Sequence, residues 1–166
     1  MSSLDRAAYR VRQLRRTLRP RVSEREREAA RLLLGPGLFP LFDSMQPADQ
    51  RHCLDVYQRL VRDGNSDPEV LRAALIHDAG KGRIAGARFD AWHRVAYVIL
   101  ENAPHLLDAI AHRNHGLRSL HEHARRTIEL AREFGAPPGV VRLLLAMKGD
   151  ATDPRAAALI AADEAS

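Results

Sequence analysis

Cysteine, aromatic residues and lysine are all scarce in this sequence. Cys53 is the only cysteine among 166 residues, which excludes an internal disulfide and a zinc site built from several cysteines. Any bound metal ion must therefore rely on histidine and carboxylate ligands. Aromatic residues make up only 5% of the chain, so we expect a core of leucine, alanine, valine and isoleucine, which suits helices packed on helices.

Long apolar runs are also missing. No stretch approaches the roughly 18 uninterrupted apolar residues of a membrane-spanning helix, and the first residues lack the apolar middle region of a secretory signal. We therefore expect a cytoplasmic chain with no membrane partner. Its 166 residues suffice for one compact domain, in which 1–45 form a helical segment and 46–166 the main helical domain. The sequence does not indicate an oligomeric state.

Positive charge is present in excess, and it is unevenly spread. The chain has 26 basic and 21 acidic residues, and only Lys81 and Lys148 are lysines. Residues 1–21 hold seven arginines against the single acid Asp5. We favour a solvated basic helix for this Arg-rich arm; the alternative is a contact for RNA, an acidic lipid surface or an anionic partner. No base-stacking aromatic pattern accompanies the arm, which argues against a nucleic-acid partner.

Strand patterns are almost absent and helix-capping patterns recur, which predicts an all-α fold, a single-domain helical bundle. Ser23 followed by Glu26 is a capping box for a helix that reaches about Leu34, where the sequence GPG should end it. The segment LFPLFDSM then serves as a connection to the next helix.

Prolines and glycines mark further helix boundaries. Pro47 is expected to begin a helix that ends at Gly64, and Asp67 with Pro68 begins another that ends at Gly80. The residues after Gly80 are expected to form a loop that a ligand can reach. Further helices are expected over 89–102, 104–112, 119–134, 138–148 and 154–165.

The motif LIHDAGKGR, residues 75–83, ends an apolar helix. Almost every residue from Val70 to Ile76 is apolar, so the second half of this helix should be enclosed. An ionised Asp78 next to His77 in such surroundings costs several kcal/mol unless it is paired or bound to a metal. A purely structural His-Asp pair would meet the same demand.

Two more polar side chains are expected at inward positions. His52 stands one turn before Val56 on the preceding helix, and Asp163 lies one turn after Leu159 on the last helix. Together with His77 and Asp78, they can share one divalent cation bound by mixed nitrogen and oxygen ligands. One or two positions would remain for water and a phosphate oxygen. Such octahedral coordination favours Mn, Mg, Fe or Co, and Zn is less natural.

The order His-x(24)-His-Asp-x(84)-Asp, with HDAGK intact, resembles the HD-domain metal-dependent phosphohydrolases. The resemblance covers about residues 46–163 and implies an HD-type helical domain. It implies four metal ligands, namely His52, His77, Asp78 and Asp163. It further implies that Asp78 and Lys81 are catalytic, that Lys81 contacts a phosphate, and that the substrate is a nucleotide or another small phosphate ester.

A second part of the chain matches the family only partly. His123 aligns with the histidine of the HPxxGA pattern that opens a helix in many HD domains, which implies a group that supports the ligands or binds a second metal. A later family histidine is missing, with Met147 or its neighbours in its place. This loss supports a rival hypothesis, a catalytically weak or inactive metal-binding regulatory module.

Two further residues have roles suggested by their neighbours. His93 shares a helix face with Phe89 and Tyr97, so we expect a packed core histidine, with the alternative that it edges the pocket as a supporting group or second-metal ligand. Arg83 follows Lys81 closely and is assigned to phosphate binding on that proximity alone.

Overall fold

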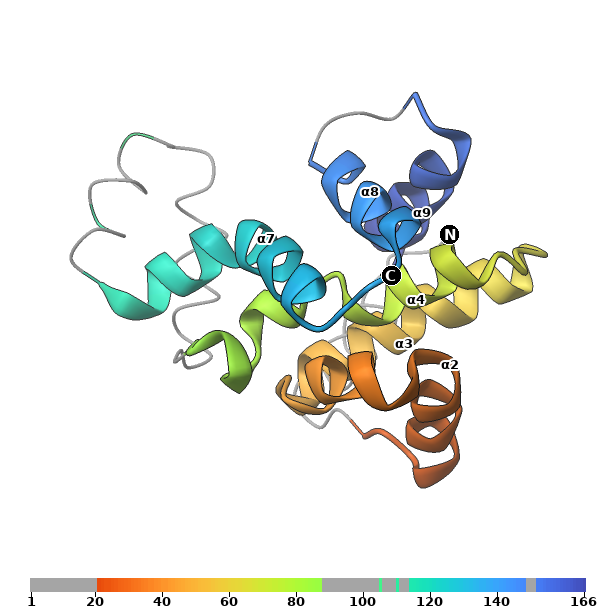
Figure 1. Cartoon of the computed structure of the whole chain (residues 1–166), viewed down its shortest axis with the longest axis horizontal. Helices are drawn as coiled ribbons and strands as arrows, with labels where there is room; N and C mark the ends of the chain where they lie inside the picture. Colours follow the sequence, from red (N-terminus) through yellow and green to blue (C-terminus); the bar gives the residue numbers. More distant parts are fainter. Residues whose placement is uncertain (1–20, 88–104, 106–109, 111–113, 149–151) are drawn as a thin grey trace, which may run out of the picture.

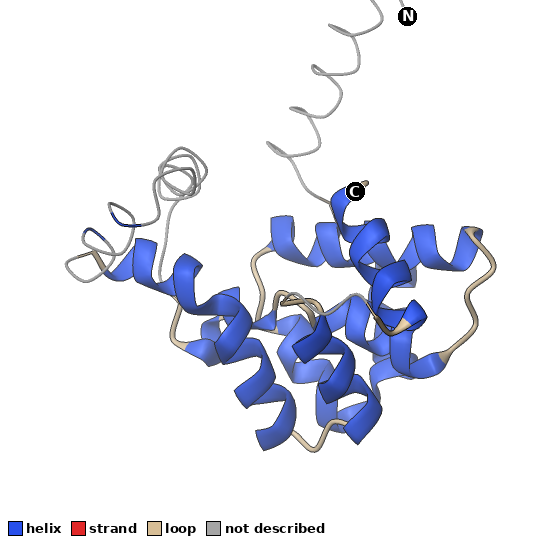
Figure 2. Cartoon of the chain, turned by 90° about the horizontal axis from the view of Figure 1, so that it is seen from above, coloured by secondary structure: helices blue, strands red, loops and turns tan. Residues whose placement is uncertain are grey.

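The computed structural model describes residues 21–87, 105, 110, 114–148 and 152–166. These residues form α-helices and short 3-10 turns, with no strand among them, so the chain is all-α as its composition predicts (Figure 2). Within this described part, no helix combines the length and apolar character needed to cross a membrane. The helices expected over 89–102 and 104–112 and the Arg-rich arm, apart from Arg21, lie outside the described residues.

The first described helix, α2 (Glu24–Asp43), is capped as predicted but is longer than predicted. Ser23 and Glu26 form the reciprocal capping box. The backbone kinks at Gly35, where φ is 67°, and then continues as helix through the segment LFPLFDSM up to Asp43. The prediction that this segment is a non-helical connection is therefore wrong. Helix resumes because the residue after the kink is proline, which needs no N–H partner in a first turn, and because the following apolar side chains are buried.

Helices α3 (Pro47–Arg62) and α4 (Pro68–Ile76) both begin at a proline, as predicted. Gly64 follows α3 with a φ of 85°, a left-handed conformation that favours glycine. Helix α4 ends at Ile76 instead of continuing to Gly80. After Ile76, His77 and Asp78 form a turn instead of a further helical turn. This turn leads into the short 3-10 segments η1 (Ala79–Lys81) and η2 (Arg83–Ala85).

Helix α7 (His115–Glu133) begins four residues before the expected start at 119. Asn114 caps it by accepting a hydrogen bond from the backbone N–H of Leu117, a cap that sequence analysis assigned to a loop. Helices α8 (Pro138–Ala146) and α9 (Pro154–Glu164) agree with the predicted segments 138–148 and 154–165 to within two residues.

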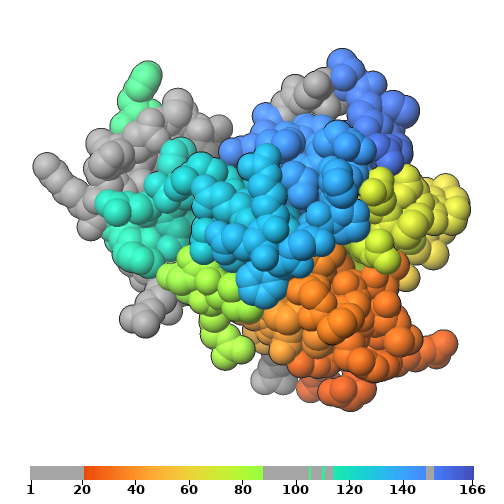
Figure 3. Space-filling view, in the orientation of Figure 1, coloured from red at the N-terminus to blue at the C-terminus, as the bar shows by residue number. Residues whose placement is uncertain are grey.

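Helix α4 lies at the centre of the bundle, in contact with α2, α3, α8 and α9 (Figure 1). Its side chains at Val70, Ala73, Ala74 and Ile76 are fully buried. Helix α7 packs against η1 and α8, and Figure 3 displays its surface, in cyan, next to the blue of α8. The turn that carries His77 and Asp78 is therefore enclosed between the central helix and α7.

Candidate metal centre

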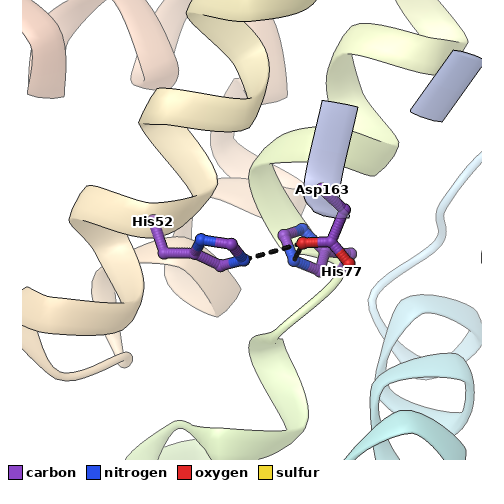
Figure 4. A group of neighbouring side chains, drawn as sticks. All are labelled: His52, His77 and Asp163. Atoms are coloured by element: carbon purple, nitrogen blue, oxygen red, sulfur yellow. Dashed lines mark hydrogen bonds and ion pairs between the residues drawn. The ribbon is translucent and has the colours of Figure 1, made fainter. Parts of the chain in front are cut away.

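His77, His52 and Asp163 come from three helices and meet at one point (Figure 4). His77 caps the end of α4, His52 lies on α3 and Asp163 lies in the last turn of α9. The Nε2 atom of His52 lies 2.8 Å from Oδ1 of Asp163, and Nε2 of His77 lies 3.3 Å from the same oxygen. These three residues offer one nitrogen or oxygen atom each, all within 4.8 Å of one another.

The hydrogen bonding of His77 fixes which ring nitrogen faces the cluster. Its Nδ1 lies 2.9 Å from the carbonyl oxygen of Ala74, and only an N–H can satisfy a carbonyl. Nε2 then faces the cluster, and it is buried without a hydrogen bond to any described residue. Nε2 lies 3.3 Å from an oxygen of Asp163, a contact that is stable only when Nε2 carries a proton or when a cation lies between the two atoms.

Asp78 forms the second side of the centre. Its carboxylate is 4% exposed, and Oδ2 accepts a bond of 2.8 Å from Nζ of Lys81. The same oxygen lies 3.9 Å from Nε2 of His77. His123, on α7, directs its Nε2 to within 3.6 Å of Oδ1 of Asp78, while its Nδ1 faces the carbonyl oxygen of Leu120. The turn thus brings Asp78 next to the three-helix cluster and joins that cluster to α7.

Thr127 attaches this turn to α7. Its hydroxyl oxygen accepts a hydrogen bond of 2.8 Å from the backbone N–H of Gly80 and donates one of 3.1 Å to the carbonyl oxygen of His77. The approach is so close that a Cβ atom on Gly80 would overlap the backbone of His123. Thr127 therefore fixes both ends of the turn from His77 to Gly80, which contains Asp78, against α7.

The carboxylates of the centre are ionised. Burial alone would raise the pKa of Asp78, but Lys81, His77 and His123 reverse this and hold its pKa far below the ordinary value. Burial likewise opposes ionisation of Asp163, and the imidazoles of His52 and His77 lower its pKa well below the usual range. Both acids therefore remain ionised in spite of burial, because positively charged or hydrogen-bonding groups lie beside them.

The imidazoles respond to this field in different ways. Burial favours neutral His77, yet the negative charge around its ring raises its pKa well above the ordinary value. Burial and the nearby Lys81 lower the pKa of His123. The centre around His77 therefore attracts positive charge, which either a proton or a metal ion can supply.

The donor chemistry fits a divalent metal ion. Metal-bound histidines commonly donate their other N–H to a backbone carbonyl, which is the arrangement of His77 with Ala74. A second group of close donors contains Cys53, His77 and Asp78. Cys53 is fully buried, and burial raises the pKa of its thiol, which disfavours the thiolate that a metal ion needs. The mixed nitrogen and oxygen set is the better match.

A cavity of about 210 Å³ opens on the centre. Its described lining includes all the polar residues of the centre, and Leu144, Met147 and Lys148 of the α8 region line it as well. Met147, the C-cap of α8, thus lies at the cavity without offering an imidazole.

Two further residues, Arg83 and His93, were predicted to belong to the site. Arg83 is exposed and is not among the described residues that line the cavity. His93 lies outside the described residues. Sequence reasoning missed Thr127 and Lys148. Thr127 occurs at helical spacing from His123, but nothing in the sequence indicates that its hydroxyl meets a turn 47 residues away. Lys148 is marked only by being one of two lysines.

Comparison with known proteins adds no relationship. No protein-family model matches the sequence, no curated protein matches it, and no solved structure matches the fold. The function is therefore inferred from the residues of the centre and from their geometry.

Proposed function

We propose that this chain is a metal-dependent phosphohydrolase of the HD-domain type, acting on a nucleotide or another small phosphate ester. One observation carries the proposal: His77 Nε2, buried without a hydrogen bond to any residue that the structure describes, faces the Asp163 carboxylate. His52, Asp78 and Lys81 lie beside it. The imidazoles and carboxylates of the centre offer ligand atoms for a cation, and the cavity gives a substrate access to that cation.

His52, His77, Asp78 and Asp163 would hold the metal ion. When bound, a divalent cation supplies Lewis-acid activation of water and of the phosphoryl group. This requires a site that is not sealed by protein, and the cavity beside the centre meets that condition. A cation that served only to join three helices would need no such cavity.

The side chains of the chain supply positioning and charge. Lys81 lines the cavity with its ammonium 2.8 Å from Asp78, where it can also bind a phosphate oxygen and stabilise the charge that develops during transfer. Asp78 presents its carboxylate to the same space, and we assign to it the orientation of the attacking water. His123 supports Asp78 from α7 or contributes to a second metal site.

The proposal is tested by elemental analysis of the purified protein, followed by a phosphate-release screen over nucleotides with added Mn²⁺, Co²⁺ or Mg²⁺. We expect a bound divalent metal and metal-dependent release from at least one substrate. The variant Lys81→Ala should keep the metal and lose most of the release. Bound metal with no release from any substrate would contradict the enzyme and favour the metal-binding regulatory module. Absence of metal would contradict both.

A further inference from the structure

Both lysines of the chain line the cavity. The sequence has 26 basic residues, and only Lys81 and Lys148 are not arginine. Both appear in the described lining of the cavity, whereas no arginine does. A chain that uses arginine for nearly every exposed cation thus uses lysine at this one place. A lysine ammonium is a compact point charge on a flexible stem, whereas a guanidinium is a wide planar fork, and a small cavity accommodates the former.

The two lysines differ in their partners. Lys81 lies on η1 and is paired with Asp78. Lys148 follows the end of α8, and its exposed side chain makes no ion pair with any other described residue. In the described lining, only Asp78 and Asp163 are acidic. If those two carboxylates neutralise a divalent cation, the charge of Lys148 is available to a ligand next to Lys81, to which the proposed function already assigns a phosphate oxygen.

We propose that Lys148 and Lys81 bind two adjacent anionic groups, so that the substrate carries a diphosphate or longer phosphate chain instead of a single phosphate ester. This inference rests on the proposed function and specifies its substrate class. The size of the cavity agrees with it. A volume of about 210 Å³ lies below the roughly 300 to 1,000 Å³ of pockets that enclose a whole drug-sized ligand. The cavity therefore takes the phosphates and leaves the rest of the substrate outside.

A simpler role for Lys148 is to complement the C-terminal end of α8, where any cation is favourable. In that role, Lys148 would not make the protein prefer a ligand with two anionic groups over a ligand with one. The two roles are separable by a matched pair of probes, methylenediphosphonate with two anionic groups and methylphosphonate with one. Neither probe contains a P–O–P bond, so neither can be consumed by a hydrolase of such bonds.

The experiment is a calorimetric titration of each probe into full-length protein loaded with Mn²⁺, with metal content measured before and after. We expect the wild-type chain to bind methylenediphosphonate at least about tenfold more tightly than methylphosphonate, the effect of one contact to a charged group. Lys148→Met should lose this preference while its affinity for methylphosphonate changes by less than about twofold. Lys148→Arg should retain most of the preference. Arg25→Met, which removes an exposed cation of α2 away from the cavity, should retain all of it.

Equal preference in the wild-type chain and Lys148→Met would overturn the inference, and so would failure of the Mn²⁺-loaded wild-type chain to bind either probe. A lowered melting temperature of Lys148→Met with unchanged preference would assign Lys148 to the helix end and overturn the inference as well. None of these results affects the metal content or the phosphate release on which the proposed function depends. Loss of Mn²⁺ from the wild-type chain before any probe is added would instead overturn the proposed metal centre.

Discussion

Two neighbouring residues of α3 belong to two different charged clusters. Arg51 joins Glu26, Asp55 and Gln58 in a cluster between α2 and α3, which we call the Glu26 cluster, while His52 belongs to the candidate metal centre. In the Glu26 cluster every carboxylate oxygen of Glu26 meets a donor: Oε1 accepts from Arg51 at 2.6 Å and from Gln58 at 2.9 Å, and Oε2 accepts from Ser23. Donors and acceptors are matched.

In the candidate metal centre, donors and acceptors are matched only in part. Lys81 donates to Asp78, but Nε2 of His77 is buried without a hydrogen bond to any described residue. Nε2 of His77 lies 3.3 Å from Oδ1 of Asp163, a contact that needs a proton or a cation between the two atoms, and Nε2 of His123 lies 3.6 Å from an oxygen of Asp78. Burial opposes charge at Asp78 as it does at Glu26, so burial is not the distinguishing feature. The Glu26 cluster is therefore complete as protein, whereas the contacts around His77 are completed either by a proton or by a metal ion.

Metal affinity should distinguish the two clusters more strongly than any other property. Asp78→Ala should reduce metal affinity by at least about 100-fold, because the loss of groups that only support ligands already costs 10-fold to 100-fold, and should abolish any hydrolysis. Asp55→Ala, which removes an acid from the Glu26 cluster, should leave metal affinity unchanged. Metal titration and circular dichroism of both variants check this. Wild-type metal affinity in Asp78→Ala would remove Asp78 from the centre.

A second effect concerns the attachment of the centre to α7. Thr127→Val keeps the shape of the side chain but leaves the N–H of Gly80 and the carbonyl of His77 without their buried partner. We expect a loss of about 2 kcal/mol in the free energy of unfolding and a metal affinity lowered about 10-fold. Thr127→Ser, which keeps the hydroxyl, should retain the metal affinity. Chemical denaturation and metal titration measure the two quantities. Unchanged metal affinity in Thr127→Val would make Thr127 a packing residue only.

The smallest expected effect lies in the matched cluster and depends on pH. Burial alone would raise the pKa of Glu26, but Arg51 and Ser23 lower it from 4.5 to about 2. A lowered folded-state pKa stabilises the fold above the unfolded value, and this contribution disappears as the pH falls from about 4.5 to 2. Glu26→Gln should therefore cost about 1 kcal/mol near pH 7, and less at pH 3, with metal affinity unaffected.

Denaturation of the wild-type chain and of Glu26→Gln at the two pH values measures that difference. Glu24→Gln is the matched control, because Glu24 is exposed in the same first turn of α2. A penalty for Glu26→Gln that grew toward acid would contradict the assigned pKa shift.

Local patterns in the sequence predicted much of the fold. The prolines at 47, 68 and 154 begin helices and Ser23 caps one, because capping and the fixed φ of proline act within a few residues. Two of the three errors at helix ends have tertiary causes, whereas the early start of α7 follows from the local cap at Asn114. Helix resumes after Gly35 because buried apolar side chains follow the kink, and α4 ends at Ile76 because the next residues are held by Thr127.

The candidate site was predictable only in its residue types. Polar residues at apolar positions of three helices indicated that His52, His77 and Asp163 could meet, and the HD-type order of the motif supplied their grouping with Asp78. The cavity, the role of Thr127 and the position of Lys148 depend on how α7 and α8 pack against the turn. Arg83 illustrates the limit of proximity in sequence, since two residues after Lys81 the chain is already exposed.

The most direct test of the central claim is X-ray absorption spectroscopy of the protein loaded with one equivalent of Co²⁺. The account predicts nitrogen and oxygen ligands at about 2.0 to 2.2 Å, with the scattering pattern of imidazole and no sulfur ligand near 2.3 Å. A sulfur ligand would assign the ion to the group that contains Cys53, and a spectrum of hydrated, unbound Co²⁺ would mean that the centre holds no metal. Either result would contradict the account.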